Sequence, residues 1–278
     1  MDLDSQFSAL LDLAFEEDGV KDITSEALFD VTEEKEATVM AKQSGVICGL
    51  KFSDTIARKV DESLVLESFL EEGDSVRDRM LVMGLSGKVI SLLRVERILL
   101  NFLSRLSGIA TLTKEFVKAI EGTQAVILDT RKTIPGWRFL DKYAVTVGGG
   151  INHRKSLEDV AMIKDTHVDA CGGVENAIRK FREKEMTKPL IVEVRSLEEL
   201  RAALPFAKSL TRIMLDNFSV ELMKEAVGIA SGKILLEASG NITLENARSI
   251  AETGVHFLSI GALTHSAPGF DLSFKIAS

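Results

Sequence analysis

The chain is a 278-residue acidic protein in which 45% of the residues are hydrophobic, 27% are charged and the formal net charge is -8. It is long enough to bury a large core, either in one barrel or in two smaller domains. A sequence pI near 5.2 argues against nucleic acid or an anionic membrane as the main partner. No stretch of 18 apolar residues occurs, so no membrane span is expected.

The N-terminus and the cysteines favour a cytoplasmic protein. The first 19 residues are acidic, contain no basic segment and place their apolar residues at helical spacing, which does not fit a signal peptide. Cys48 and Cys171 form neither a CxxC pair nor a zinc-ligand spacing. We expect them to be reduced, buried thiols.

The first third of the chain has the pattern of an α+β layer. Helical spacing of apolar residues predicts a helix over 4–15, which Gly19 ends. Between residues 37 and 85, short apolar runs alternate with glycines and acidic turns, and one amphipathic helix is expected over 52–60. This order indicates an α+β domain rather than a βα repeat.

Residues 88–120 follow a helical repeat, with apolar side chains every three or four positions. They predict one long helix, or two helices broken near Gly108. Glu96 and Arg97 interrupt the apolar repeat, and from spacing alone this charged pair fits a solvated stripe better than a functional role.

Beyond residue 124 the period is that of βα units. Apolar runs of strand length lie at 125–128, 160–163, 190–192, 212–215, 233–236 and 257–260. Helical segments are expected between most of them, at 174–184, 197–204, 219–229 and 243–252. Six such units indicate a parallel sheet or a barrel.

Polar groups that can bind a ligand are expected at the C-terminal end of each of these strands. These groups are Asp129 to Lys132, Lys164-Asp165, Glu193, Asp216-Asn217, Glu237 to Gly240, and Ser259 to Gly261. In a barrel, such strand ends converge on one face and form one pocket. Glu193 and Asp216 would suit Mg²⁺ or ribose hydroxyls there, although either carboxylate taken singly fits a turn or helix-capping role equally well.

Residues 129–167 concentrate positive charge in an acidic protein. The stretch contains Arg131, Lys132, Arg138, Lys142, Arg154, Lys155 and Lys164, with His153 and His167. A solvated face beside a flexible glycine loop is the simplest interpretation. Against it, Arg131 and Lys164 stand at or close to the ends of apolar runs, and Gly148-Gly149-Gly150 lets backbone approach a ligand. The stretch therefore indicates a site for phosphates and carboxylates.

Four long motifs carry a resemblance to a known family: DTRKTIPGWRFLDKYAVTVGGGINHR, IKDTH, ERILLNFLSRLSGIATLT and LLEASGNITLENARSIAETGVHFLSIGALTHS. They resemble the quinolinate phosphoribosyltransferase family (nicotinate-nucleotide pyrophosphorylase, carboxylating), and the similarity extends over nearly the full chain. The resemblance implies an α/β fold: an N-terminal α+β open sandwich over 1–112, joined by 270–278, and an incomplete (β/α) barrel over 113–269. The site would lie at the C-terminal ends of the barrel strands.

The resemblance also implies an activity. A family member is a pentosyltransferase that transfers the phosphoribosyl group of PRPP to quinolinate, with release of pyrophosphate and CO₂. The product is nicotinate mononucleotide for de novo NAD biosynthesis, and Mg²⁺ is required. A homodimer is implied, with each active site shared between the two subunits and with higher assembly possible.

The resemblance assigns residues to quinolinate. Arg131, His153, Arg154 and Lys164 match the family's quinolinate-contacting residues, and Arg97 matches an arginine donated by the other subunit.

Other positions match the PRPP side of the site. Lys132 and His167 match residues around the PRPP phosphates, and Glu193 and Asp216 match an acidic pair that faces the ribose and the metal. The phosphate-binding loops are matched by Ser239, Gly240, Gly261 and His265. The catalytic set implied is Glu193, Asp216, Lys132 and Lys164.

Two departures from the family's motifs occur. Thr166 stands where the family commonly has asparagine, which replaces an amide near Lys164 by a shorter hydroxyl. In the acidic strand, Ile191 replaces the first glutamate and Arg195 follows Val194, so only Glu193 keeps the motif.

Three alternatives stay open. A relative of the same fold associated with molybdate transport is disfavoured by the IKD-x-H segment and the His153-Arg154 pair. A different barrel enzyme, such as a decarboxylase of phosphate ligands, would not need Arg97. A non-catalytic nucleotide-binding regulator would bind ligand without forming product.

Overall fold

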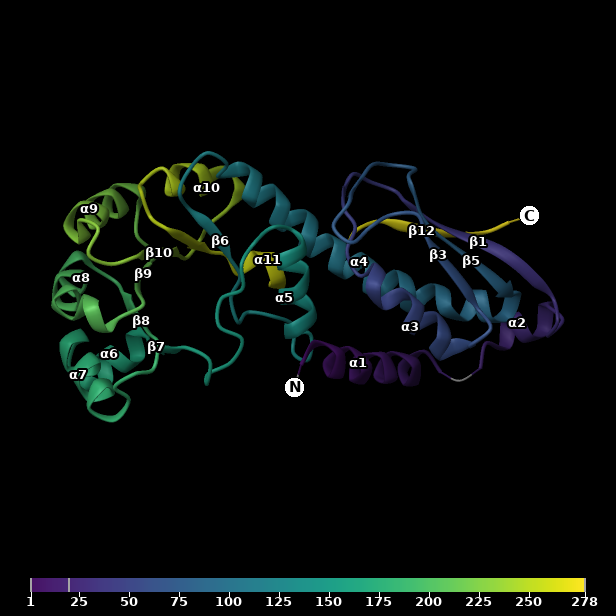
Figure 1. Cartoon of the computed structure of the whole chain (residues 1–278), viewed down its shortest axis with the longest axis horizontal. Helices are drawn as coiled ribbons and strands as arrows, with labels where there is room; N and C mark the ends of the chain where they lie inside the picture. Colours follow the sequence, from purple (N-terminus) through teal and green to yellow (C-terminus); the bar gives the residue numbers. More distant parts are fainter. Residues whose placement is uncertain (1, 20, 278) are drawn as a thin grey trace. The chain divides into compact units, whose positions relative to one another are not determined.

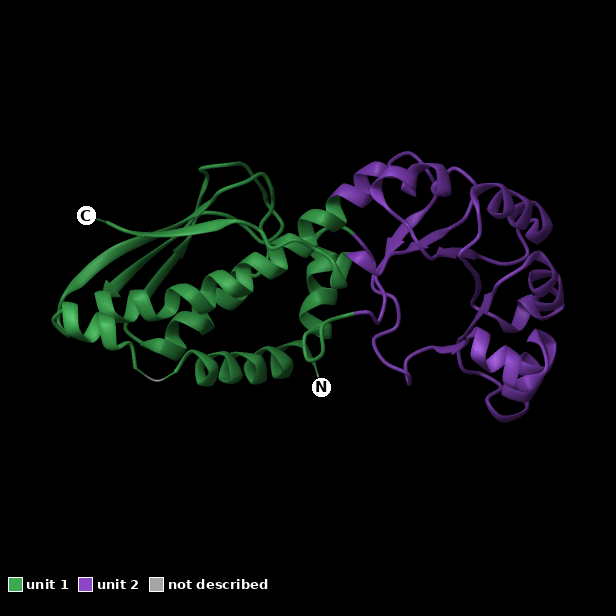
Figure 2. Cartoon of the chain, turned by 180° about the vertical axis from the view of Figure 1, so that it is seen from behind, with its two compact units in different colours: residues 1–114, 133–149, 263–278 green, residues 115–132, 150–262 purple. Residues whose placement is uncertain are grey.

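The computed structural model describes residues 2–19 and 21–277. Its chain forms two compact units (Figure 2). Unit 1 comprises Met1–Lys114, Thr133–Gly149 and Leu263–Ser278, and unit 2 comprises Glu115–Lys132 and Gly150–Ala262. Met1, Val20 and Ser278 fall within these ranges but lie outside the described residues.

Unit 1 is built on an antiparallel sheet. Its strands are β1 (Glu34–Ala41), β3 (Val65–Ser68), β5 (Leu81–Lys88) and β12 (Leu272–Ile276), in the order β12-β1-β5-β3. Two short strands, β2 (Gly45–Val46) and β4 (Ser75–Val76), form a separate ladder. Alternate residues Ala37, Val39 and Ala41 are buried, as expected when one face of an antiparallel sheet is covered. The C-terminal strand therefore completes the sheet of the N-terminal segment.

Helices cover one face of this sheet, where α3 and α4 lie (Figure 1). The helices that contribute to unit 1 are α1 (Leu3–Asp18), α2 (Ile23–Leu28), α3 (Leu50–Val60), α4 (Val89–Ala119), α5 (Arg138–Val147) and α11 (Ala262–His265). The predicted helix over 4–15 is confirmed as α1, which ends at Gly19 with φ +88. The predicted helix over 52–60 is confirmed within α3.

Helix α4 is continuous, so the prediction of one long helix is the correct alternative. Gly108 does not break it. A side chain at Gly108 would overlap the carbonyl oxygen of Pro268, whose chain crosses α4 at this point. Because Gly108 has no side chain, the backbone near Pro268 can approach the backbone of α4 closely.

The segment that contains α5 packs with unit 1. Arg105 on α4 donates two hydrogen bonds to the fully buried carboxylate of Asp141, at 2.9 and 2.7 Å. The rings of Phe102 and Trp137 lie 5.0 Å apart, and Gln6 accepts a hydrogen bond from the backbone of Phe139. The domain limits expected from the sequence stay a prediction. They assign the segment Thr133–Gly149 to the barrel, whereas the contacts of this segment join it to unit 1.

Unit 2 contains a parallel sheet of six strands. They are β6 (Val126–Leu128), β7 (Ala161–Ile163), β8 (Leu190–Val194), β9 (Arg212–Asp216), β10 (Leu236–Ser239) and β11 (Phe257–Ser259), in the order β6-β11-β10-β9-β8-β7. On the outer side of the curved sheet lie α6 (Asp165–Cys171), α7 (Val174–Lys184), α8 (Leu197–Ala203), α9 (Val220–Ala230) and α10 (Leu244–Ala251) (Figure 1). A 3₁₀ helix, η1 (Leu204–Ser209), follows α8. The predicted helices are confirmed with small shifts at their ends.

The barrel is incomplete, as predicted. Strands β6 and β7 are the two edges of the sheet. Residues 150–152 run along the open edge of β6, where Ile151 forms a parallel bridge with Leu128 and donates to the carbonyl of Ile127 at 2.9 Å. The loop after the glycine run thus occupies part of the gap that a further strand would fill.

Strand β10 begins later than the sequence predicted. The apolar run 233–236 overlaps it only at Leu236, and Glu237 and Ser239 lie inside the strand rather than after it. Left-handed residues Ser231 and Gly232 turn the chain before the strand, and pairing with β9 starts where Leu235 accepts from Ile213. Glu193 likewise lies inside β8.

Within the described ranges, no helix combines the length and the apolar content needed to cross a membrane.

Gly108→Ala is expected to destabilise the protein by about 1–3 kcal/mol, because the new methyl group overlaps backbone that cannot move freely. Gly228→Ala is the matched control: this glycine is also inside a helix, α9, and nothing lies within 4 Å of its added Cβ. The control should gain roughly 0.5–1 kcal/mol from helix propensity. Urea unfolding of both variants measures the difference, and equal stability changes would contradict a close approach at Gly108.

Candidate functional site

The register of the parallel strands places the predicted carboxylates on one face of the unit 2 sheet. Glu193 pairs with Met214 in β9, and Glu237 pairs with the same Met214 from the other side. Two residues further along β9, Asp216 pairs with Ser239. Paired residues of parallel strands point to the same side, and side chains alternate along a strand. These polar groups therefore share the face opposite the helices.

Glu193 and Lys164 form an ion pair at this face. The Lys164 Nζ lies 3.4 Å from the Glu193 Oε2; the lysine side chain is 47% exposed and the glutamate side chain 9% exposed. Burial raises the pKa of Glu193; the charge of Lys164 opposes this shift, while the nearby charge of Asp216 adds to it. Two carboxylates and one cation are thus gathered at the ends of β7, β8 and β9.

Helix α6 begins at this point and brings in His167. The backbone N–H of Lys164, which precedes the helix, donates to the His167 Nδ1 at 3.0 Å. Both side chains are exposed. One turn of helix therefore presents the Lys164 ammonium group and the His167 ring together.

Backbone contacts at the open barrel edge place His153 and Arg154. The N–H of His153 donates to the buried carboxylate of Asp129 at 2.8 Å. The Arg154 guanidinium donates to the carbonyl of Val160 at 3.0 Å. Burial lowers the pKa of Arg154, and the neighbouring charge of Arg131 lowers it further. The two guanidinium groups are therefore close enough to repel, which favours an anionic ligand between or beside them.

Arg131 and Lys132 follow β6. Arg131 is half-buried and Lys132 is exposed, and the backbone N–H of Lys132 donates to the Thr130 hydroxyl at 3.0 Å. This turn directs the chain away from the sheet immediately after Asp129.

The loop after β10 depends on a glycine. Gly240 has φ +97, and a Cβ there would lie 2.6 Å from the Asn217 Cγ and overlap the Asn217 Oδ1. Asn217 in turn donates from its backbone to the carbonyl of Ser239 at 2.8 Å and from its side chain to Asp216 at 2.9 Å. The loop of Gly240 and the end of β9 are thus packed into one unit. Gly261, half-buried, follows β11 at the next strand end.

Two predicted site residues belong to unit 1. Arg97 is exposed on α4. His265 ends α11 and is exposed, with its Nδ1 2.6 Å from the Ser266 hydroxyl.

The structure places three further polar residues among the site residues of unit 2: the sequence indicated Asp129 and Glu237 only as strand-end groups without a role, and it did not indicate Arg212. Glu237 and Asp129 are fully buried, and Arg212 forms an ion pair with Glu237. Arg212 lies within the apolar run 212–215, and Glu237 directly follows the run 233–236. A charged residue at such a position is the signal that could have identified them. A charge inside a strand predicts a buried partner.

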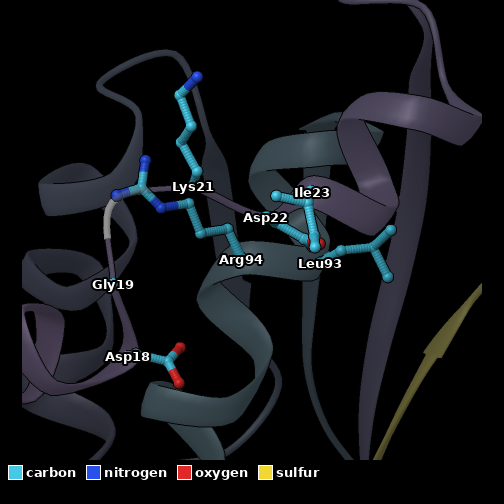
Figure 3. Close-up of a pocket in the computed structure, with 7 residues that line it drawn as sticks. All are labelled: Asp18, Gly19, Lys21, Asp22, Ile23, Leu93 and Arg94. Atoms are coloured by element: carbon cyan, nitrogen blue, oxygen red, sulfur yellow. The ribbon is translucent and has the colours of Figure 1, made fainter.

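A cavity of about 240 Å³ lies in unit 1 (Figure 3). Its lining is Asp18, Gly19, Lys21, Asp22, Ile23, Leu93 and Arg94. None of the predicted site residues contributes to it, and its two acidic and two basic side chains do not favour ligands of either charge.

Glu193 and Asp216 can hold Mg²⁺ if a substrate and water supply the remaining ligands. No cluster of three or more histidine, cysteine, aspartate or glutamate side chains arranged for a metal occurs in residues 2–19 and 21–277. Mg²⁺ commonly takes one or two protein carboxylates and completes its shell with substrate phosphates and water. Glu193 and Asp216 therefore fit a metal that arrives with a phosphorylated substrate.

The open barrel, with cations and paired carboxylates at its strand ends, defines an α/β-barrel enzyme that takes anionic substrates. Two family models cover most of the chain: quinolinate phosphoribosyl transferase, N-terminal domain, over residues 22–107, and its C-terminal domain over residues 109–275. The chain belongs to the quinolinate phosphoribosyltransferase family.

Similar relatives span nearly the same length. The chloroplastic nicotinate-nucleotide pyrophosphorylase (carboxylating) of Arabidopsis thaliana is 42% identical over 96% of this chain and 82% of its own. The probable nicotinate-nucleotide pyrophosphorylase (carboxylating) of Bacillus subtilis is 38% identical over 98% of this chain and 93% of its own. The solved nicotinate-nucleotide pyrophosphorylase from Francisella tularensis has a TM-score of 0.94 at 36% identity and covers 100% of this chain and 98% of its own.

Gly240→Ala is expected to lower both stability and kcat/KM, because the new Cβ displaces Asn217 and with it the end of β9. Gly232→Ala is the control: its φ of +72 is also left-handed, but nothing lies within 4 Å of the added Cβ. Both variants carry backbone strain of roughly 1 kcal/mol or more. Only Gly240→Ala should lose activity as well, and two variants with equal losses of Tm and unchanged kcat/KM would contradict the packing role.

Proposed function

We propose that this protein transfers the phosphoribosyl group of PRPP to quinolinate, releasing pyrophosphate and CO₂ and forming nicotinate mononucleotide in de novo NAD biosynthesis. The observation that carries this proposal is the gathering of Arg131, Arg154 and Lys164 near the carboxylates Glu193 and Asp216 in unit 2. Membership of the family supports the same reaction.

Binding of quinolinate follows from charge. The substrate carries two carboxylates, which an acidic protein would repel without a local excess of cations. Guanidinium groups of Arg131 and Arg154 can each hold a carboxylate through two hydrogen bonds, and Lys164 adds a point charge. Held at both carboxylates, the pyridine ring has one orientation, which aims its nitrogen at the anomeric carbon of PRPP. His153 lies in the same set, directly before Arg154.

Glu193 and Asp216 act on the ribosyl centre. As the bond to pyrophosphate breaks, positive charge develops on the ribose ring, and two nearby carboxylates stabilise it. Lys164 partly offsets the effect of burial on the pKa of Glu193, which favours the ionised form that this role requires.

The phosphates of PRPP would be bound by Lys132, His167 and the loops of Ser239, Gly240, Gly261 and His265. We also propose Mg²⁺ at Glu193 and Asp216, where a bound ion supplies positive charge for the leaving pyrophosphate.

Decarboxylation needs no separate base. Once its nitrogen is alkylated, the pyridine ring is cationic. The electron pair released as the 2-carboxylate leaves as CO₂ is held at the ring carbon beside this cationic nitrogen, and a proton then takes the place of CO₂.

We propose a homodimer in which Arg97 reaches the partner's site. Arg97 is exposed on α4, and it makes no ion pair within the described ranges. Because this guanidinium reaches solvent, it can contact an anionic substrate bound by the other subunit. A cytoplasmic location is proposed from the free thiols of Cys48 and Cys171.

Incubation with quinolinate, PRPP and Mg²⁺ is expected to yield nicotinate mononucleotide and CO₂ in equal amounts, measured by chromatography and by trapped ¹⁴CO₂ from carboxyl-labelled substrate. Nicotinate, which lacks one carboxylate, should react poorly, since an unpaired buried cation costs about 2–5 kcal/mol. Ligand binding without product would indicate a regulator, and similar kcat/KM for both acids would contradict the assignment of the cations.

Arg97→Ala and Lys164→Ala homodimers should each be nearly inactive if sites are shared, because each variant lacks one wall of both pockets. A mixed dimer carries both defects in one pocket and none in the other. Random reassortment of equal amounts should therefore restore about a quarter of wild-type activity, since about half of the dimers are mixed and each has one intact site. Co-expression under two tags isolates the mixed dimer, and inactivity of that species would assign Arg97 to its own subunit.

A further inference from the structure

Glu237 is a buried carboxylate at the centre of a polar network in unit 2. Its side chain is fully buried on β10. Arg212 on β9 forms an ion pair with it, and the Ser259 hydroxyl on β11 donates to its Oε1. The His153 Nε2 lies 3.3 Å from the same oxygen, slightly longer than an ordinary hydrogen bond. Three strands and the open-edge loop thus meet at one side chain.

Glu237 is ionised in this network. Burial by itself would raise its pKa, but the contacts with His153 and Arg212 outweigh burial and hold the pKa below its usual value. A buried ion pair with further hydrogen bonds tolerates the loss of water that an isolated carboxylate would not.

The network sets the tautomer of His153. The backbone N–H of Arg154 donates to the His153 Nδ1 at 2.7 Å, so Nδ1 carries no proton. The ring proton is therefore on Nε2, the nitrogen that lies 3.3 Å from the Glu237 carboxylate. Both ring nitrogens face protein groups in this arrangement.

The network also balances the negative charge of Glu237. The carboxylate of Glu237 is balanced by the Arg212 guanidinium, so it adds little repulsion toward a bound dicarboxylate. The positive charge of the Arg154 guanidinium is left for a ligand.

We propose that Glu237 is a positioning residue for substrate: it fixes the His153 ring, and through the contact of His153 with the Arg154 backbone it holds Arg154 in place for the quinolinate carboxylate. His153 then serves quinolinate by orienting Arg154. The identity of the ligand rests on the proposed function.

Glu237→Gln tests this role by removing the charge while keeping the shape. The KM for quinolinate should rise by about tenfold or more, while the KM for PRPP changes less than about twofold. Because the unpaired Arg212 could unfold this variant, Glu237→Gln/Arg212→Met removes both charges and should show the same selective loss.

Asp141→Asn is the matched control, since Asp141 is also a fully buried carboxylate paired with an arginine, Arg105. It should lower Tm without a selective change in the KM for quinolinate. A general loss of stability in the Glu237 variants would raise both KM values or neither, and that result would overturn the proposal.

Nitrogen NMR gives a readout independent of turnover. The chain has four histidines, so the ¹⁵N signals of His153 can be assigned by their loss in His153→Asn. The wild-type protein should show an Nε2-protonated ring, and Glu237→Gln should shift it toward a mixture of tautomers. An unchanged ring pattern in both Glu237 variants would refute the proposal even if the wild-type enzyme proved inactive on quinolinate, an outcome that would refute only the proposed function.

Discussion

In-register pairing of β8, β9 and β10 is the constraint on which the whole site depends. Glu193 and Glu237 both pair with Met214, and Asp216 pairs with Ser239. A slip of one residue would turn these polar side chains toward the helices and bring the buried aliphatic side chains of the same strands to the opposite face. The hydrophobic cost of that slip therefore protects the geometry of the site as well as the core.

An acidic chain can bind anions only where it gathers its cations, and the structure shows how their repulsion is contained. Arg131 and Arg154 are close enough for one to lower the pKa of the other, while Glu193 and Glu237 act on Arg154 in the opposite direction. The site is thus a balanced mixture of charges rather than a patch of one sign. An anionic ligand would reduce the repulsion between the two guanidinium groups.

The open edge of the barrel lets a loop, rather than a strand, place His153 and Arg154. A closed barrel would place a strand beside β6, and its side chains would alternate in and out. Here a loop bridges to Leu128 through Ile151, and its successive residues His153 and Arg154 both turn into buried positions. A loop can place neighbouring side chains on one side, which a strand cannot.

The sequence by itself determined the fold class, most helices and the approximate positions of the strands, because hydrophobic periodicity is a local property that each segment carries alone. Long motifs added the family and a set of roles that stay predictions. The start of β10 and the burial of Glu237 required the tertiary structure. A strand begins where its neighbours supply hydrogen-bond partners, and a carboxylate is stable inside a sheet only beside partners such as Arg212 and His153, which come from distant parts of the chain.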